Sequence, residues 1–201
     1  ELIHNYLLIH DDILDEDEMR RGKKTFHKLH GQNMAICAAD MISALGYEAL
    51  SSCQFPSDDK LKALEKLNQT LYFTCYGQML ELNLREKKSF TDNDVLQIHT
   101  KKTAFYTLVA PLQIGALLAG ASKSFLKKIE KFALPLGIAF QIRDDLEDGD
   151  IEKVFRLSKE KYQKLLEKLV VQAKNNLNLE KDFPKKEKEF LLNLADYCNS
   201  K

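Results

Sequence analysis

Apolar residues recur along almost the whole chain at the three- and four-residue spacing of an α-helix, and the alternation of a β-strand is nearly absent. The spacing predicts helices over about 1–18, 33–53, 58–85, 91–109, from Pro111, from Ser122 to an acidic cluster at 144–148, 158–176 and 184–199. The polar, glycine-punctuated segment 19–32 is predicted to be a loop. Eight or so helices with short connections predict one all-α domain, 1–201, built as a helical bundle around a central cavity.

Local signals mark several helix starts. Phe55-Pro56 breaks the second helix, and Ser57 is the predicted N-cap of the third. Thr91, with Asp94 three residues later, has the pattern of a capping box.

Charge and cysteine content exclude several classes. Thirty Lys and Arg balance thirty Asp and Glu, so neither nucleic acid nor an anionic membrane is expected as a partner. The longest apolar stretch, 108–121, is shorter than the roughly 20 residues of a membrane span and is predicted to be a buried helix. Four cysteines without a CxxC pair argue against zinc and predict reduced core residues, as in a cytoplasmic protein.

Two acidic clusters repeat one pattern. Residues 11–15 read Asp-Asp-Ile-Leu-Asp and residues 144–148 read Asp-Asp-Leu-Glu-Asp, so both fit D-D-x-x-D. On a helix the first and last aspartates share a face, which costs a few tenths of a kcal/mol through like-charge repulsion. A single such cluster is often only a solvated helix end, but two predict that the repulsion is offset by a ligand.

Oxygen-only ligands on one helix face suit Mg²⁺. Two such helices facing each other would hold several metal ions, and a diphosphate is the natural guest because the ions bridge it to the carboxylates. Arg20 and Arg21 follow the first cluster, and guanidinium groups bind phosphate oxygens in bidentate fashion. Lys102 and Thr103 add an ammonium and a hydroxyl suited to phosphate. Taken alone, each of these pairs is ordinary surface charge.

Five segments in order resemble the trans-polyprenyl synthetase family, which includes farnesyl and geranylgeranyl diphosphate synthases. They are His10–Asp15 with Met19–Lys23, Gly77–Leu82 (a GQ motif), Lys102–Ala104 (a KT motif), Phe140–Asp145 (FQ-x-x-DD) and the C-terminal helix 190–197. The resemblance covers nearly the whole chain. It implies an all-α isoprenoid-synthase fold and a homodimer.

The resemblance also implies residue roles. Direct magnesium ligands would be Asp11, Asp15 and Asp144, with Asp12, Asp145 and Asp148 completing or supporting the metal shells, for three ions with substrate bound. The allylic diphosphate would be held by Arg20, Lys102, Thr103 and Gln141. The diphosphate of isopentenyl diphosphate would be held by Arg21 and His4. The groups acting directly in catalysis would be Asp11, Asp12, Asp15, Asp144 and Lys102.

The implied reaction is a head-to-tail prenyl transfer. Diphosphate leaves the allylic substrate, the double bond of isopentenyl diphosphate attacks the resulting cation, and a proton is lost to the released diphosphate. Two family features are missing from the sequence: a Gly-Lys-x-x-Arg motif before the first cluster, and a lysine-bearing loop after the second. We therefore expect that N-terminal helices and a loop near 150/151 lie outside the sequence given.

Product length is predicted from the helix before the first cluster. Leu7, Asp11 and Asp15 share a side, and Tyr6 lies about 7–8 Å along the helix from Asp11. A bulky Tyr6, with Leu7, would form the floor of the channel for the growing chain, unless Tyr6 is an ordinary core residue. An aromatic five residues before an uninterrupted D-D-x-x-D resembles enzymes that make geranylgeranyl diphosphate (C20).

Three alternatives stay open. The chain could instead be a farnesyl diphosphate synthase (C15). A terpene cyclase of the same fold usually replaces the second D-D-x-x-D with an Asn/Ser/Glu triad, which residues 144–148 do not show. A non-catalytic partner subunit of a heteromeric synthase tends to lose aspartates from the clusters, and both clusters are intact here.

Overall fold

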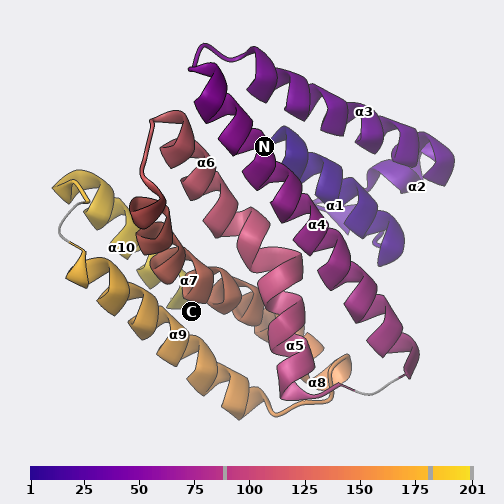
Figure 1. Ribbon diagram of the computed structural model, residues 1–201. Coiled ribbons are helices and arrows are strands. Elements are labelled where there is room, and N and C mark those ends of the chain that lie inside the picture. The colour runs from indigo at the N-terminus through magenta and orange to yellow at the C-terminus, as the bar shows by residue number, and fades with distance from the viewer. Residues whose placement is uncertain (88–89, 181–182, 200–201) are drawn as a thin grey trace. The chain divides into compact units, whose positions relative to one another are not determined.

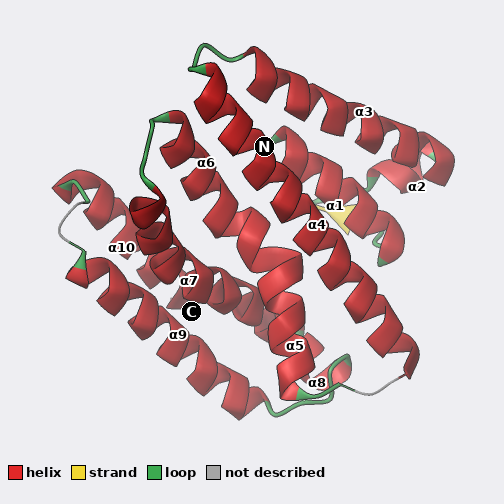
Figure 2. Ribbon diagram, viewed as in Figure 1, coloured by secondary structure: helices red, strands yellow, loops and turns green. Residues whose placement is uncertain are grey.

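The structure is a computed structural model that describes residues 1–87, 90–180 and 183–199. The described part is helical apart from one short β-hairpin (Figure 2). It divides into two compact units, 1–56 and 57–201. The predicted all-α class is confirmed, and the single-domain organisation stays a prediction.

The first unit contains two long helices, a hairpin and a short helix, in the order α1 (Leu2–Leu14), β1 (Met19–Arg20), β2 (Lys23–Lys24), α2 (Phe26–His30) and α3 (Gln32–Ser52). The first helix ends four residues earlier than predicted, because the chain leaves the helical path at Glu16, whose φ is 57°. The segment 19–32 is not a plain loop. Arg21 and Gly22 both have positive φ, which is the type I′ geometry that closes a two-residue hairpin.

Helix α3 lies where predicted and packs on α1. Within the described residues it is the one helix whose length and mean hydropathy of 1.2 would allow it to cross a membrane. Length and composition alone are weak evidence for a membrane span, because core helices of soluble proteins and signal sequences pass the same test. The stretch 108–121, by contrast, contains the nine-residue helix α6 with a buried face, as predicted.

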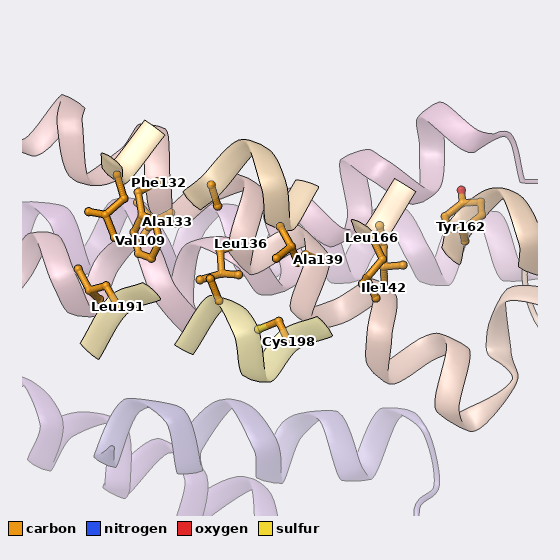
Figure 3. Close-up of a cluster of buried hydrophobic side chains, with 14 of the residues drawn as sticks. Val109, Phe132, Ala133, Leu136, Ala139, Ile142, Tyr162, Leu166, Leu191 and Cys198 are labelled. Atoms are coloured by element: carbon orange, nitrogen blue, oxygen red, sulfur yellow. The ribbon is translucent and has the colours of Figure 1, made fainter. Parts of the chain in front are cut away.

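The second unit is a bundle around α7. Its elements are α4 (Ser57–Lys87), α5 (Asp92–Ile98), η1 (His99–Val109), α6 (Ala110–Leu118), α7 (Lys123–Asp148), α8 (Asp150–Lys153), α9 (Lys159–Leu179) and α10 (Lys185–Asn199). Helix α7 packs along both η1 and α9 (Figure 1). Its apolar side chains, such as Phe132, Leu136 and Ile142, are almost fully buried (Figure 3). Each such side chain contributes about 1.5–3 kcal/mol to folding.

Capping explains where most of these helices begin. The predicted Thr91–Asp94 capping box is present, and the Ser122 and Ser158 hydroxyls accept hydrogen bonds from backbone N–H groups in the first turns of α7 and α9. Ser57 is the first residue of α4 rather than the residue before it. The helix predicted over 91–109 is two elements: an α-helix ends at Ile98, and an eleven-residue π-helix, η1, follows it.

All four cysteines are free thiols, but the prediction that they are core residues is wrong for three of them. Cys198 is buried, Cys53 is partly exposed, and Cys37 and Cys75 are exposed. The apolar residues around Cys37 and Cys75 are spread over more than one helix face, so a hydrophobic neighbourhood in sequence did not mean burial. Burial raises the pKa of the Cys198 thiol to about 11.

An apolar cavity of about 460 Å³ lies between α6, the first half of α7 and the start of α10. Phe125, Phe132 and Phe190 are among its lining residues. Along α7, Phe125 is roughly 28 Å from Asp144 at 1.5 Å per residue. The cavity therefore lies at the opposite end of α7 from the second acidic cluster.

Candidate functional site

The first acidic cluster lies at the C-terminal end of α1. Asp11 and Asp12 are in its last turn, and Asp15 caps it with helical backbone angles, its N–H donating to the Asp11 carbonyl at 2.9 Å. Asp11 and Asp15 thus keep the helical spacing that places them on one face. Asp12 is buried, so the three carboxylates are not equivalent.

Arg20 folds back onto this cluster from the hairpin. Its Nε donates to Asp12 Oδ1 at 2.7 Å, and its Nη2 lies 2.5 Å from the same oxygen and 3.7 Å from Asp11 Oδ2. Burial acts to lower the pKa of Arg20, but its hydrogen bond to Asp12 and the surrounding carboxylates outweigh this and raise it. Arg21 occupies the turn and is exposed. The hairpin therefore separates the two arginines, one bound to aspartates and one exposed.

Three further predicted residues lie on α1. His4 Nδ1 is 3.6 Å from Glu1 Oε2, the Tyr6 ring lies edge-on to His10 with centroids 5.0 Å apart, and Leu7 is half-buried. One turn separates Leu7 from Asp11, as the sequence predicted. Their assignment to substrate binding and chain length stays a prediction.

The second acidic cluster forms the C-terminal end of α7, which Gly149 terminates in a left-handed conformation. Burial, with the neighbouring charges of Asp145, Glu147 and Asp148, raises the pKa of Asp144 to about 6. Asp148 is exposed. Burial and the neighbouring charges disfavour the ionised form of Asp144, so a bound divalent cation would stabilise that form.

Asp145 differs from its neighbours because it points into the second unit. It is 6% exposed; its Oδ2 lies 2.7 Å from His99 Nε2, and its Oδ1 accepts a hydrogen bond from Gln141 Nε2 at 2.7 Å. Both oxygens therefore have protein partners. This supports a supporting role for Asp145 over direct metal ligation.

The KT motif lies on η1 beside a buried carboxylate on α4. Lys102 Nζ donates to Glu81 Oε2 at 2.8 Å, and Arg85 also donates to Glu81. Burial would raise the pKa of Glu81, but the charges of Lys102 and Arg85 outweigh it and hold the pKa below its usual value. Thr103, the next residue on η1, is buried. Glu81 thus fixes the ammonium group at the start of η1.

Two glycines allow η1 to pack this closely. A Cβ added to Gly77 of α4 would lie 2.8 Å from Lys102 Cα, and one added to Gly137 of α7 would lie 2.8 Å from Ala104 Cα. Real Cβ atoms essentially never come this close to another heavy atom, so only glycine fits at either position without a shift of the backbone. Gly77, the glycine of the GQ motif, is therefore required by the packing, because it leaves room for the backbone of the KT segment.

The donor set fits magnesium. All candidate ligands are carboxylate oxygens, and a cation would offset the burial and the neighbouring negative charges that raise the pKa of Asp144. Within the described ranges, no group of three or more His, Cys, Asp or Glu side chains is arranged to hold a metal ion unaided. The remaining ligands would be water and phosphate oxygens, which Mg²⁺ commonly keeps.

The structure brings some of the predicted site residues into contact and places unpredicted residues beside them. It brings Arg20 to Asp11 and Asp12 in the first unit, and it links the KT element to the second cluster through His99 in the second unit. His99 and Arg85 were not predicted, and Glu81 was noted only as part of a motif. A charged residue on an apolar helical face was the available signal for Glu81; nothing in the sequence singled out His99.

Comparison with known proteins gives one family. A family model described as polyprenyl synthetase matches residues 1–154. A geranylgeranyl pyrophosphate synthase of Geoglobus acetivorans is 38% identical over 148 residues, covering 74% of this chain and 46% of that protein. A farnesyl diphosphate synthase of Geobacillus stearothermophilus is 36% identical over 163 residues, covering 77% and 54%.

The fold agrees with these matches. The solved geranylgeranyl pyrophosphate synthetase of Geoglobus acetivorans superposes with a TM-score of 0.88 at 29% identity, covering 100% of this chain and 78% of that one. The sequence matches to the curated relatives, however, span only about half of those proteins' length.

Proposed function

This chain belongs to the polyprenyl synthetase family, and we propose that it is a magnesium-dependent trans-prenyltransferase that condenses isopentenyl diphosphate with an allylic diphosphate. The observation that carries the proposal is the second acidic cluster. Asp144 lies among other carboxylates at the end of α7. The hydrogen bond between His99 and Asp145 joins the same end of α7 to η1, which carries Lys102 and Thr103. Carboxylates for a cation and an ammonium for an anion are the parts that a metal–diphosphate complex requires.

The residues divide the work by chemistry. Magnesium, when bound, would neutralise the diphosphate and favour its departure. Asp11, Asp15 and Asp144 supply oxygen ligands for it, and Asp12, Asp145 and Asp148 complete or support the metal shells. Lys102 and Thr103, with Arg20 and Gln141, hold the allylic diphosphate, and Arg21 and His4 hold that of isopentenyl diphosphate. Arg20 would exchange its contact with Asp11 for phosphate oxygens while Asp12 keeps it in place.

We propose geranylgeranyl diphosphate as the product, supported by Tyr6 and by the name of the Geoglobus relative. Farnesyl diphosphate is the alternative, supported by the Geobacillus relative. The reading as a non-catalytic partner subunit is disfavoured because both aspartate clusters are complete. Three magnesium ions, a homodimer and a cytoplasmic location complete the proposal; the free thiols are in keeping with a reducing compartment.

The deciding experiment is a product assay. The chain is incubated with Mg²⁺, isopentenyl diphosphate and dimethylallyl, geranyl or farnesyl diphosphate, and mass spectrometry sizes the products. A dominant C20 product supports both the proposed reaction and the proposed product length. A C15 product supports the reaction and shows that the product is shorter than proposed. No product with any primer, together with no Mg²⁺-dependent binding of a bisphosphonate, would favour the partner-subunit reading.

A further inference from the structure

His99 is a buried imidazole whose polarity needs a reason. It is the first residue of η1, it is 1% exposed, and its ring lies edge-on to Phe155 with centroids 6.0 Å apart. Its Nδ1 is buried with no hydrogen-bond partner among the described residues. An apolar ring would fill this place without leaving a buried nitrogen unsatisfied, which is costly. The bond that Nε2 makes to Asp145 is what the histidine adds.

That bond decides which way Asp145 faces. His99 holds one carboxylate oxygen and Gln141 the other, each at 2.7 Å, so the carboxylate is held from the protein side. Asp144 is only half-buried and Asp148 is exposed, so these two remain accessible to a cation. The three aspartates of the motif therefore differ: Asp145 is buried and held by two protein partners, whereas Asp144 and Asp148 are not buried.

The same bond joins two elements of the candidate site. Lys102 and Thr103 follow His99 by three and four residues, within the five-residue span of one π-helical hydrogen bond. His99 therefore connects the segment that carries the ammonium to the helix end that carries the carboxylates. Gly137 of α7, packed against Ala104, holds the other side of the same contact.

We propose that His99 is a positioning residue for the metal–diphosphate site, fixing Asp145 as an anchor and setting η1 against the last turn of α7. The inference rests on the proposed function, because it assumes that Asp144 and Asp148 receive a cation. Partners that orient metal-binding groups typically change metal affinity about 10- to 100-fold when removed. His99 contacts neither substrate nor metal in this scheme and acts through Asp145.

The test compares three variants of the full chain. His99→Phe removes the hydrogen bond, His99→Gln keeps an N–H that reaches Asp145, and Ile98→Val is the control at the neighbouring buried position. Electron paramagnetic resonance of free Mn²⁺ measures binding of the metal alone, and calorimetry with a bisphosphonate measures its Mg²⁺ dependence. We expect His99→Phe to weaken metal binding about 10- to 100-fold and His99→Gln to restore it to within about threefold, with Ile98→Val unchanged.

Each outcome decides the inference. The inference is overturned if His99→Phe binds metal as tightly as Ile98→Val. It is also overturned if His99→Gln binds metal no more tightly than His99→Phe, because the volume of the ring would then matter and the hydrogen bond would not. If His99→Phe does not fold, His99→Asn replaces it, because asparagine is too short to reach Asp145 and should show the same loss. No Mg²⁺-dependent bisphosphonate binding by the unaltered chain would overturn the proposed function and the inference together. If the unaltered chain binds and His99→Phe binds equally well, the inference alone is overturned.

Discussion

Asp144 carries most of the electrostatic strain of the second cluster. Its folded-state pKa of about 6 lies above the value of 3.8 for an unperturbed aspartate, because burial and three acidic neighbours oppose its charge. A raised pKa contributes stability while the carboxyl is protonated, and that contribution is lost as the pH rises through about 6. The metal-free protein should therefore be strained at neutral pH.

Asp144→Asn should stabilise the metal-free chain at about pH 8 and not at about pH 3, because the carboxyl is neutral in both the folded and the unfolded state at the lower pH and charged in both at the higher pH. After allowance for solvent screening of this half-exposed group, the gain is about 1 kcal/mol, or about 2–4 °C in Tm. Thermal unfolding in EDTA at both pH values measures it. The exposed Asp148→Asn is the control and should shift less; an equal shift at both pH values would contradict the explanation.

Tyr6 is the residue on which the product prediction depends. Tyr6→Ala should lengthen the products, because it removes a ring one turn from the first cluster on α1. The measurement is the mass distribution of products made from farnesyl diphosphate and isopentenyl diphosphate. Tyr72→Ala, at an exposed tyrosine of α4, is the control and should leave the distribution unchanged. Unaltered product lengths with Tyr6→Ala would make Tyr6 an ordinary packing residue.

Residue type and order pointed to the aspartates, the arginine pair and the KT residues. They did not predict that neighbouring residues of the same type would differ in exposure and in their contacts. Arg20 and Arg21 are adjacent and chemically identical, yet a type I′ turn sends one to Asp12 and leaves the other exposed. Asp144 and Asp145 differ in the same way, because adjacent positions on a helix point about 100° apart. These differences depend on backbone angles and distant partners such as His99, which a linear pattern does not record.

At the scale of elements, η1 is held by close packing on two sides. Gly77 of α4 admits the backbone at Lys102, and Gly137 of α7 admits it at Ala104. Because the neighbouring atoms are backbone, they cannot rotate away from an added methyl group. Elements that must approach this closely are sensitive to a single carbon atom.

Gly77→Ala should displace η1 and destabilise the fold by about 1–3 kcal/mol, the usual cost of overpacking. Gly115→Ala is the matched control: it lies inside α6 with nothing within 4 Å of an added Cβ, so it should be neutral or stabilise by up to about 1 kcal/mol. Denaturant unfolding of both variants measures the difference. Equal free energies of unfolding for the two variants would mean that η1 can move away from the added methyl group without loss of stability.

Helix existence and helix starts were predictable because caps are local: Thr91 with Asp94, Ser122 and Ser158 act within one turn. The π-helix was not, because the apolar spacing of 91–109 fits an α-helix as well. The early end of α1 was also missed, since the acidic run 15–18 continues the helical pattern that Glu16 leaves.

At the scale of the whole molecule, the motifs are divided between the two compact units. The first cluster and its arginines lie in residues 1–56, and the second cluster and the KT motif lie in residues 57–201. The sequence identified all of them because each motif is short and its order is fixed. It could not identify the units, since the division depends on contacts between residues far apart in the chain.

The need for a metal ion and a phosphate ligand together gives the last prediction. Because each cluster supplies only part of a metal shell, Mg²⁺ or a bisphosphonate alone should stabilise the chain little, and the two together should stabilise it strongly. At about 100 times the dissociation constant, linkage gives about 2.7 kcal/mol, which is about 5–10 °C in Tm for a chain of this size. Thermal unfolding with each component and with both measures the effect. Since the metal neutralises the repulsion between carboxylates and phosphates, an equal shift by the bisphosphonate in EDTA would place the ligand away from both clusters and contradict the proposed site.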